Sequence, residues 1–507
     1  MSDAMLVRGR WVVAAADEPG LTDGAVAVQG GTIAAVGAYA DLRARYPEAE
    51  VLGSERFAVI PGLINAHHHS AGVSYLQHGV ADRLLEPWIM AMACRRSGDA
   101  YLDTLLSAAR LLRCGVTSVV DVHSGGGTAE AYAARAGRAL KAYDEAGMRV
   151  AFAIGYSEQS HLIAGEDEAF LASLPDDVKP IAEAYLPGPE RLDRDDFFGL
   201  FDDLWQAHKH HPRIDLWLAP PGPQWVADDF MQQIGEAARR YGCGIQTHVE
   251  ESFYEKLHGP RCYGKPTVEH LRDLGVLSPH FSLAHGVWLS EPEIAILAET
   301  GAAVSHNPSS NLRLRAGIAP LNALLAGGAT TALGMDGTTL NDDEDMFTEM
   351  RLALRLHRTP RLDGPAPEPA QVFALATVGG AKLMRQETRL GRLAPDFAAD
   401  LVLLDLERIT WPWVAPEADP RDLILMRARA DDVHSVLVEG EVVVRDGRPT
   451  RFDAAAAGAE LAERMAAAAV PDYTDAILER LLPLLEAHYL GWEAPELEPY
   501  DCYNARR

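Results

Sequence analysis

Cysteine is scarce in this chain of 507 residues, and its five cysteines follow no spacing pattern. They stand at Cys94, Cys114, Cys243, Cys262 and Cys502. Their number is odd and no two of them are spaced as C-x-x-C, so the sequence indicates neither a disulfide framework nor a thiolate zinc site. Such cysteine usage is typical of a reducing compartment, and we therefore expect a cytoplasmic protein.

An excess of positive charge and long apolar runs are also lacking. The formal net charge is -27 at pH 7, which opposes binding to a phosphate backbone or to an anionic membrane surface. No stretch reaches the ~18 apolar residues of a membrane span, and the first residues do not combine a basic region with an apolar run. We expect no nucleic acid partner, no membrane partner and no export.

The chain does contain apolar runs typical of strands that alternate with long helical patterns. Hydrophobic residues make up 48% of the sequence and charged residues 23%, as in ordinary globular proteins. Eight strands are predicted, at 59–66, 116–122, 149–155, 214–219, 244–247, 281–284, 302–305 and 330–334. Eight βα units in ~330 residues favour an α/β fold of the (β/α)8 TIM-like barrel type over an open sheet. We place this barrel at 58–395.

The two ends of the chain predict a smaller β domain. Short alternating strands are expected at 5–7, 11–14, 25–29 and 32–36, with a hairpin at Gly30-Gly31, and a similar pattern returns between 399 and 447. Each half is too small to stand alone, so we predict one composite β-sandwich built from 1–57 and 396–450. Residues 451–507 are expected to form a C-terminal helical extension, broken at Pro471 and Pro483.

A histidine cluster follows the first predicted barrel strand. The segment reads Pro61-Gly-Leu-Ile-Asn-Ala-His67-His68-His69, and on a strand His67 and His69 project to the same side. Strands five, six and eight are followed by His248, His285 and Asp336. Functional groups of a barrel gather at the carboxyl ends of its strands, and catalytic zinc takes nitrogen and oxygen ligands with one position left for water. Three histidines and one aspartate from this set predict such a site.

These motifs resemble the amidohydrolase superfamily, in particular its cytosine deaminase and chlorohydrolase-like branch. The resemblance extends from the N-terminal β segment to about Gly447, and it rests on the histidine cluster, His248-Val-Glu-Glu251, Ala284-His285-Gly286, Ser305-His306-Asn-Pro-Ser-Ser-Asn311 and Leu333-Gly-Met-Asp336-Gly. It implies that one divalent metal, with Zn²⁺ the leading candidate and Fe²⁺ or Mn²⁺ as alternatives, is held by His67, His69, His248 and Asp336. It also implies that Glu251 shuttles protons and that His285 contacts the water or the substrate.

The chemistry of these residues agrees with the resemblance. A divalent metal lowers the pKa of water from ~16 toward 7 and polarises the electrophilic centre, and a carboxyl group with a raised pKa at Glu251 can take a proton and return it. Binuclear members of the superfamily carry a carboxylated lysine after strand four, but 216–225 contains no lysine, so one metal per chain is expected. His123 and His306 also lie near strand ends and are weaker candidates for ligand contact.

The substrate contacts are expected at the same strand ends. Nucleoside deaminases of this branch commonly carry a Pro-His-Ala-Pro-Tyr-like segment after strand four, whereas this chain reads Pro220-Pro-Gly-Pro-Gln224-Trp225, which disfavours an adenosine-like substrate. The amide of Gln224 and the flat ring of Trp225 suit an amide-bearing or aminated heterocycle, although core packing is an equally common role for tryptophan. The predicted substrate contacts are Gln77, Trp88, Tyr156, Gln224 and Trp225.

The sequence thus predicts a metal-dependent hydrolase of non-peptide C–N bonds that deaminates a small aminated heterocycle, namely a purine, pterin, pyrimidine or triazine. The same attack by water could expel chloride or an alkylamine from a triazine, or open a cyclic amide of the imidazolone type. A metal-bearing binding protein without catalysis is a further alternative, against which the intact Glu251 and Asp336 count. We also expect a homo-oligomer, a dimer or larger.

Overall fold

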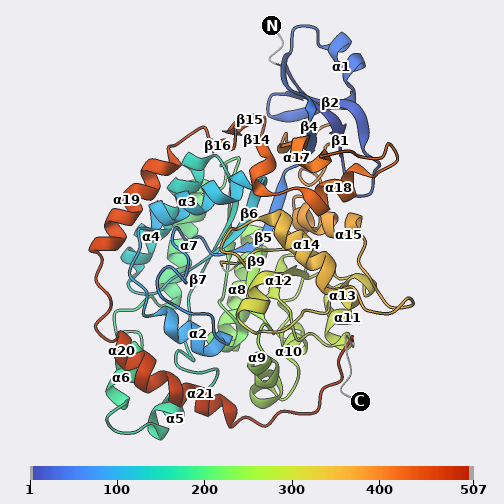
Figure 1. Ribbon diagram of the computed structural model, residues 1–507. Helices are drawn as coiled ribbons and strands as arrows, with labels where there is room; N and C mark the ends of the chain where they lie inside the picture. Colours follow the sequence, from blue (N-terminus) through green and yellow to red (C-terminus); the bar gives the residue numbers. More distant parts are fainter. Residues whose placement is uncertain (1–3, 338, 502–507) are drawn as a thin grey trace.

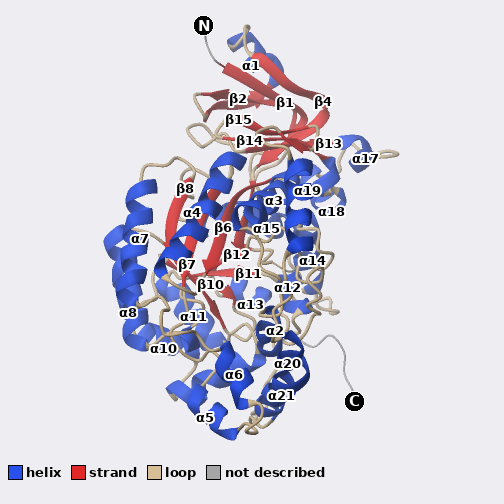
Figure 2. Cartoon of the chain, turned by 90° about the vertical axis from the view of Figure 1, so that its left-hand side faces the viewer, coloured by secondary structure: helices blue, strands red, loops and turns tan. Residues whose placement is uncertain are grey.

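Eight parallel strands form the core of the larger body of the protein (Figures 1 and 2). The computed structural model describes residues 4–337 and 339–501, so Cys502 lies outside the described residues. The strands are β5 (Leu63–His68), β6 (Val116–Ser124), β7 (Arg149–Gly155), β8 (Ile214–Leu218), β9 (Ile245–Val249), β10 (Phe281–His285), β11 (Ala303–His306) and β12 (Thr330–Leu333). Each pairs with the next in sequence order. Seven of the predicted barrel strands are confirmed, and the first is confirmed only in part: the barrel strand begins at Leu63, because 59–61 belongs to β4 (Glu50–Pro61) of the other sheet.

The barrel closes where the first and last strands meet. The backbone N–H of Asp336 donates to the carbonyl of His67 at 2.9 Å, and the N–H of Met335 donates to the Asn65 Oδ1 at 2.9 Å. Most positions of the strands are buried, and β7 is buried at every position, because helices cover the outer face of a parallel sheet. The predicted (β/α)8 architecture is therefore confirmed.

The covering helices alternate with the strands along the chain. Helix α4 is capped at both ends. The hydroxyl of Thr128, just before the helix, accepts a bond from the N–H of Ala131, and Gly147, just after it, is in the left-handed region (φ 71°). The helices of the barrel are α2 (Leu85–Met92), α3 (Ala100–Arg113), α4 (Ala129–Ala146), α5 (Asp167–Ser173), α6 (Lys179–Tyr185), α7 (Arg194–His208), α8 (Asp228–Tyr241), α9 (Phe253–His258), α10 (Thr267–Asp273), α11 (Glu291–Thr300), α12 (Pro308–Arg313), α13 (Leu321–Ala326), α14 (Met346–Leu356), α15 (Pro369–Ala374) and α16 (Gly380–Leu383).

Strands from both ends of the chain form a second sheet, which stands above the barrel in Figure 1. Its order is β16-β15-β14-β13-β4-β1-β2-β3. The strands are β1 (Ala4–Val12), β2 (Leu21–Gln29), β3 (Thr32–Ala38), β4 (Glu50–Pro61), β13 (Leu401–Asp405), β14 (Val433–Val438), β15 (Glu441–Arg445) and β16 (Arg448–Pro449). Short helices flank it: α1 (Tyr39–Arg45), α17 (Leu406–Thr410) and α18 (Pro420–Arg427).

The two halves of this composite domain join where β4 pairs with β13 in antiparallel register. The sheet also curls back on itself, since the N–H of Ala399 donates to the carbonyl of Gly31 at 2.9 Å. Gly30 and Gly31 both have positive φ, as a two-residue hairpin between β2 and β3 requires. The predicted composite domain and its hairpin are confirmed, whereas the domain limits stay a prediction.

The prediction of two separate strands at the start of the composite domain is wrong. The sequence predicted two short strands at 5–7 and 11–14, but β1 runs without interruption from Ala4 to Val12. Its register against β4 shifts between Gly9 and Trp11. This bulge shifts the pairing without ending the strand.

The C-terminal extension is helical and runs along the side and the lower end of the barrel in Figure 1. It comprises α19 (Ala454–Ala467), α20 (Thr474–Ala476), a π-helical turn at Ile477–Leu481 and α21 (Leu482–Leu490). The predicted break at Pro483 is wrong: the helix continues from α20 through the π-helical turn into α21, and Pro483 lies just after that turn, where the regular hydrogen-bond pattern is already altered. Beyond α21, the hydroxyl of Tyr500 donates to the carbonyl of Leu289 after β10, at 3.0 Å. In the described part of the chain, no helix has the length and apolar character to cross a membrane.

Candidate active site

Four strand ends bring the predicted histidines and aspartate together. His67 and His69 come from the end of β5, His248 from β9, His285 from the last position of β10 and Asp336 from the segment after β12. The Nε2 atoms of His69 and His248 are 3.2 Å apart, and the Asp336 Oδ1 lies 3.8 Å from the His67 Nε2 and 3.7 Å from the His69 Nε2. The Asp336 Oδ2 lies 3.8 Å from the His285 Nε2.

Each of the four imidazole rings is oriented by a hydrogen bond from its other nitrogen. The Nδ1–H of His67 donates to the Gln246 Oε1 at 2.9 Å and that of His285 to the Asn311 Oδ1 at 2.9 Å. The Nδ1–H groups of His69 and His248 donate to the backbone carbonyls of Val122 (2.8 Å) and Pro221 (2.6 Å). With Nδ1 protonated, the lone pair of each neutral ring is on Nε2 and faces the shared centre, as in metal-ligating histidines.

Burial and neighbouring charges set the protonation of this cluster. Burial lowers the pKa of His248 to about 3 and the pKa of His67 well below its usual value. Burial alone would raise the pKa of Asp336, but electrostatic interaction with the surrounding imidazole groups and the hydrogen bond from Ser310 outweigh it and hold that pKa below its usual range. Neutral imidazoles around an ionised carboxylate are the forms that bind a divalent cation.

The donor atoms fit a divalent metal. His67 is fully buried, and within the described residues its Nε2 finds no hydrogen-bond partner. A buried polar atom without a partner is costly, and a cation at the shared centre would satisfy it. Two overlapping sets of ligand atoms lie close enough to hold one ion: His67, His248 and His285, and His67, His69 and Asp336. The site therefore supports a divalent metal.

Three residues at these strand ends have left-handed backbones, which is rare outside glycine. They are Glu250 (φ 50°), His285 (φ 75°) and Asp336 (φ 55°). Two of them, His285 and Asp336, belong to the cluster, and Glu250 precedes Glu251. Such backbone strain concentrates at functional sites, where the surrounding structure holds it.

Glu251 adds a carboxyl group beside the cluster. It is 3% exposed, its Oε2 lies 3.4 Å from the His285 Nε2, and its backbone N–H donates to the Glu255 Oε2 at 2.7 Å. Burial, followed by the neighbouring carboxylates of Glu255 and Asp336, raises the pKa of Glu251 well above its usual value. A carboxyl group with a raised pKa at this position can hold a proton near neutral pH and transfer it.

The predicted substrate contacts are dispersed. Gln224 is buried, and its amide Nε2–H donates to the Glu255 Oε1 at 2.7 Å. Because Glu255 also accepts a bond from the backbone N–H of Glu251, Gln224 is linked to Glu251 through Glu255. Trp225 is half-buried beside Gly222. Trp88, on α2, is buried edge-on against Tyr75.

The other candidates have different surroundings. Gln77 is exposed, and its side-chain oxygen accepts a bond from the N–H of Ser74. Tyr156 packs on Phe197 and Phe230. His123 packs on Tyr132 and Phe152, and the His306 Nε2 faces the His357 Nε2 at 2.9 Å. Substrate contact by any of these residues stays a prediction.

Sequence reasoning missed several residues that support the site. Gln246 lies two positions before His248 on β9 and so faces the same side of the strand, a signal that was available. Ser252 and Glu255 form a capping box at the start of α9, which the spacing S-x-x-E indicates. Glu86 accepts a hydrogen bond from the Ser252 hydroxyl, and burial raises the pKa of Glu86 to about 7. No local pattern pointed to Glu86.

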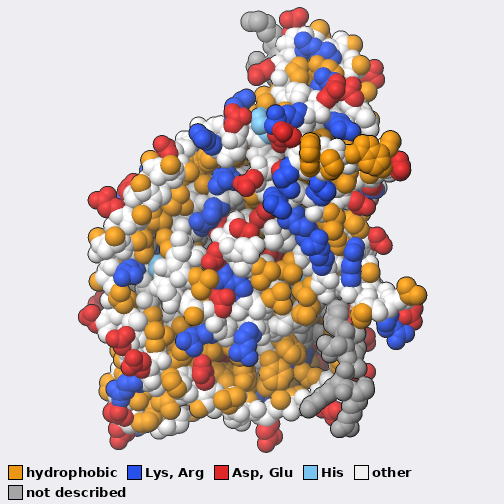
Figure 3. Space-filling model, viewed as in Figure 1, with side chains coloured by type: hydrophobic (Ala, Val, Ile, Leu, Met, Phe, Trp, Pro, Cys, Tyr) orange, Lys and Arg blue, Asp and Glu red, His pale blue; other side chains and the backbone are white. Residues whose placement is uncertain are grey.

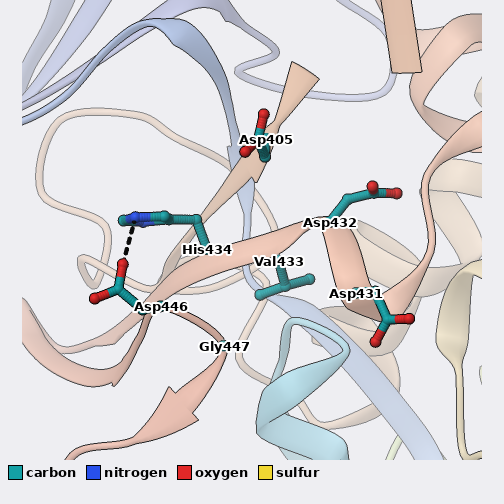
Figure 4. Close-up of a pocket in the computed structure, with 7 residues that line it drawn as sticks. All are labelled: Asp405, Asp431, Asp432, Val433, His434, Asp446 and Gly447. Atoms are coloured by element: carbon teal, nitrogen blue, oxygen red, sulfur yellow. Dashed lines mark ion pairs between the residues drawn. The ribbon is translucent and has the colours of Figure 1, made fainter. Parts of the chain in front are cut away.

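A surface cavity of about 240 Å³ lies on the composite β domain (Figure 4). Its lining residues are Asp405, Asp431, Asp432, Val433, His434, Asp446 and Gly447. His434 and Asp446 form an ion pair at 2.9 Å across it. None of these residues belongs to the histidine cluster, so this cavity is separate from the candidate active site.

A TIM-like barrel with a histidine–aspartate metal centre and a buried glutamate at its strand ends defines the class of metal-dependent hydrolases. Residues 58–443 match the model of the amidohydrolase family, and the chain belongs to that family. Residues 24–49 match an imidazolonepropionase-like composite domain of bacteria.

Characterised relatives cover most of the chain. A 5-methylthioadenosine/S-adenosylhomocysteine deaminase of Nitratidesulfovibrio vulgaris (strain DSM 19637 / Miyazaki F) is 33% identical over 438 residues, which span 85% of this chain and 90% of the relative. A 5'-deoxyadenosine deaminase of Methanosarcina mazei is 29% identical over 89% of this chain and 95% of its own length. The structure of a zinc-bound adenosine deaminase from Xanthomonas campestris matches with a TM-score of 0.78 and 25% identity, over 91% of this chain and 98% of that one.

Proposed function

We propose that this protein is a zinc-dependent aminohydrolase that removes an amino group from a purine, with an adenosine-type nucleoside as the leading substrate. Water adds to the ring carbon that bears the amino group and ammonia leaves, so the product carries a carbonyl in place of the amine. The observation that carries the proposal is the Glu251 carboxyl group, 3.4 Å from the His285 Nε2 at the edge of the histidine–aspartate cluster.

We assign one Zn²⁺ per chain to His67, His69, His248 and Asp336. The unpartnered Nε2 of His67 supports this assignment, and so does the absence of lysine from 216–225. The ion would supply Lewis acidity and acidify a water molecule. The relatives reported above are named for deamination, which favours loss of ammonia over loss of chloride or an alkylamine.

The residues around this centre divide the proton transfers. Glu251, with its raised pKa, takes a proton from the attacking water and delivers it to the departing amine. Because the Nδ1–H of His285 is held by Asn311, its Nε2 is free to accept a hydrogen bond from the water or the substrate. The Ser310 hydroxyl donates to the Asp336 Oδ2 at 2.6 Å and fixes the orientation of that carboxylate.

The segment after β8 disfavours an adenosine-type substrate, but the relatives that cover 85% and 89% of this chain are named for such substrates, and the proposal follows the relatives. We propose that Gln224, oriented by Glu255, contacts the base or its sugar. We also propose a cytoplasmic homo-oligomer. Hydrophobic side chains form a patch beside α17 and α18 in Figure 3, and between these helices Trp411 and Trp413 are 72% and 75% exposed, which is typical of a contact surface.

The test is a panel of aminated heterocycles assayed for ammonia release by the zinc-loaded enzyme. The panel contains adenosine, 5'-deoxyadenosine, 5-methylthioadenosine, guanine, cytosine, an aminated pterin and an aminated triazine. We expect the purine nucleosides to give the highest kcat/KM. Turnover of the triazine alone, or release of chloride from a chlorotriazine with no ammonia from any purine, would contradict the proposal.

A further inference from the structure

A buried ion network lies directly behind the Glu251 loop. The side chain of Glu250 is 0% exposed, and its two carboxylate oxygens lie 3.0 and 3.3 Å from the Lys256 Nζ. The same Nζ donates to the Glu293 Oε2 at 2.6 Å. The side chains of Glu293 and Lys256 are 1% and 16% exposed. One ammonium group therefore links two buried carboxyl groups from different parts of the chain. Glu250 directly precedes the turn into α9, and Glu293 lies in the first turn of α11.

Glu293 is itself anchored at the start of α11. Its Oε2 also accepts bonds from the backbone N–H of Ser290 at 2.9 Å and from the Ser290 hydroxyl at 2.5 Å. The helix that follows β10 is thereby tied through Lys256 to the loop that follows β9. A charged group held by several short hydrogen bonds has little freedom to move.

The backbone of Glu250 makes a second connection between the same two loops. Its carbonyl accepts hydrogen bonds from the N–H groups of Val287 at 2.9 Å and Trp288 at 3.0 Å, and the N–H of Gly286 donates to the carbonyl of Val249 at 3.2 Å. Gly286 directly follows His285, and Glu250 directly precedes Glu251. The network and these bonds therefore lie one residue away from each member of the Glu251–His285 pair.

We propose that Glu250, Lys256 and Glu293 are positioning residues that hold Glu251 against His285. The backbone of Glu250 is in the left-handed region (φ 50°), a conformation that persists only where surrounding contacts enforce it. Without the ammonium group, the Glu250 and Glu293 carboxyl groups would stay buried together with no positive charge beside them. Glu250 would then turn toward water and its backbone would relax. Glu251 would lose its position beside the His285 Nε2. The catalytic part of this inference rests on the proposed function, whereas the coupling of the two loops does not.

The first measurement requires no substrate. Lys256→Met keeps the length of the side chain and removes its charge, and Lys265→Met is the matched control, because Lys265 pairs with Asp273 at the surface. We expect hydrogen exchange at the amides of Gly286, Val287 and Trp288 to become faster in Lys256→Met and to stay unchanged in the control. Unchanged protection in Lys256→Met would overturn the proposal whatever reaction the enzyme catalyses.

The second measurement separates positioning from general stability. In the metal-loaded enzyme we expect Lys256→Met to lower kcat about 10- to 100-fold with little change in KM, as for residues that orient catalytic groups. In a Glu251→Gln background the same substitution should lower kcat no further, because the group that it positions is already lost. Losses that multiply in the double variant would refute positioning.

A milder variant covers the case in which Lys256→Met fails to fold. Glu293→Gln keeps the shape and an acceptor for Ser290 but weakens the attraction to Lys256, and Glu291→Gln, exposed on the same helix, is its control. We expect the same changes in exchange and kcat, of smaller size, in Glu293→Gln alone. If no substrate of the panel is turned over, the proposed function fails and the exchange measurement still decides whether the network couples the loops.

Discussion

His67 shows how the surrounding residues prepare one side chain for its task. The ring is fully buried, its Nδ1–H is held by Gln246, and its Nε2 is left to face three further ligand groups. Gln246 is held in turn, since its amide donates to the carbonyl of Ala66 at 2.8 Å. At the scale of the residue, the site is therefore built in two layers, and substitutions in each layer have different expected effects.

Glu251→Gln is expected to keep the metal and to lose most turnover. The amide preserves the shape of the side chain but cannot accept and return a proton, so kcat should fall about 10²- to 10⁴-fold. His69→Ala removes a metal ligand and is expected to lose the metal itself. Metal analysis and steady-state kinetics on both variants distinguish the two roles. A Glu251→Gln protein with near-normal kcat would show that another group, with His285 the next candidate, moves the proton.

Gln224→Leu is expected to reorder the substrate panel more than it lowers the highest rate. Gln224 carries no group that titrates near neutral pH, so its contribution is to orient the substrate. The substitution also leaves the Glu255 Oε1 without its amide donor. The ratios of kcat/KM across the panel are the measurement, with Gln232→Leu, at an exposed position of α8, as the comparison. Unchanged ratios would mean that Gln224 only packs against Glu255.

The stability of the protein is expected to depend on the ionisation of His357. Burial lowers its pKa to about 4, below the value of about 6.5 for an unfolded chain. Between these values the unfolded state binds a proton that the folded state does not, so stability is full above about pH 6.5 and is lost as pH falls through 4. The loss approaches about 3 kcal/mol.

The variant His357→Gln isolates this contribution. It keeps an amide near His306 and does not titrate, so its free energy of unfolding should fall less than that of the wild type between pH 7 and pH 4.5. Urea unfolding of both proteins at the two pH values is the measurement. Parallel losses in both proteins would mean that His357 titrates at its ordinary pKa in the folded state.

Residues at strand ends could be predicted from the sequence, whereas residues placed by packing between distant elements could not. His67, His69, His248, His285 and Asp336 could be predicted because each follows an apolar strand, and strand order fixes where such residues meet. Asn311 and Glu86 support the site from a short helix and from α2, and their contribution depends on packing between elements distant in sequence. The strained backbone at Glu250 and His285 also has no signal in residue type, since non-glycine residues rarely adopt it.

At the scale of the element, the C-terminal helices form a satellite core against the barrel loops. Leu481, Leu482, Leu485 and Tyr489 pack with Met90 of α2 and with Phe170 of α5. The Tyr489 hydroxyl accepts a bond from the N–H of Ala164 at 2.8 Å. Because α2 also carries Glu86, which contacts Ser252 beside Glu251, this satellite core supports one wall of the active site.

Two leucines of α21 provide a matched test of that support. Leu485 is 1% exposed, whereas Leu490 is 79% exposed. We expect Leu485→Ala to lower the free energy of unfolding by about 2–5 kcal/mol and Leu490→Ala to change it by less than about 0.5 kcal/mol. Chemical denaturation of the two variants is the measurement. Equal small effects would show that α21 is peripheral to the fold.

At the scale of the whole molecule, metal binding and folding are coupled. The proposed metal ligands come from β5, β9 and the segment after β12, so the site exists only when the barrel is closed. A metal that binds the folded state alone stabilises it. We expect about one metal per chain, and a melting temperature that falls on chelation and recovers with Zn²⁺. The variant His69→Ala should show neither response. A stoichiometry near two, or a melting temperature that is indifferent to chelator, would contradict the single shared site.

The composite sheet has a consequence for synthesis on the ribosome. Strand β4 ends at Pro61 and its partner β13 begins at Leu401, so almost the whole barrel is translated between the two. Until then the growing chain carries the strands β1 to β4 with the edge of β4 unpaired, and an exposed strand edge can pair with other chains. The composite sheet is thus completed only after the barrel strands have been translated, and a chain that stops before β13 keeps an open, association-prone edge.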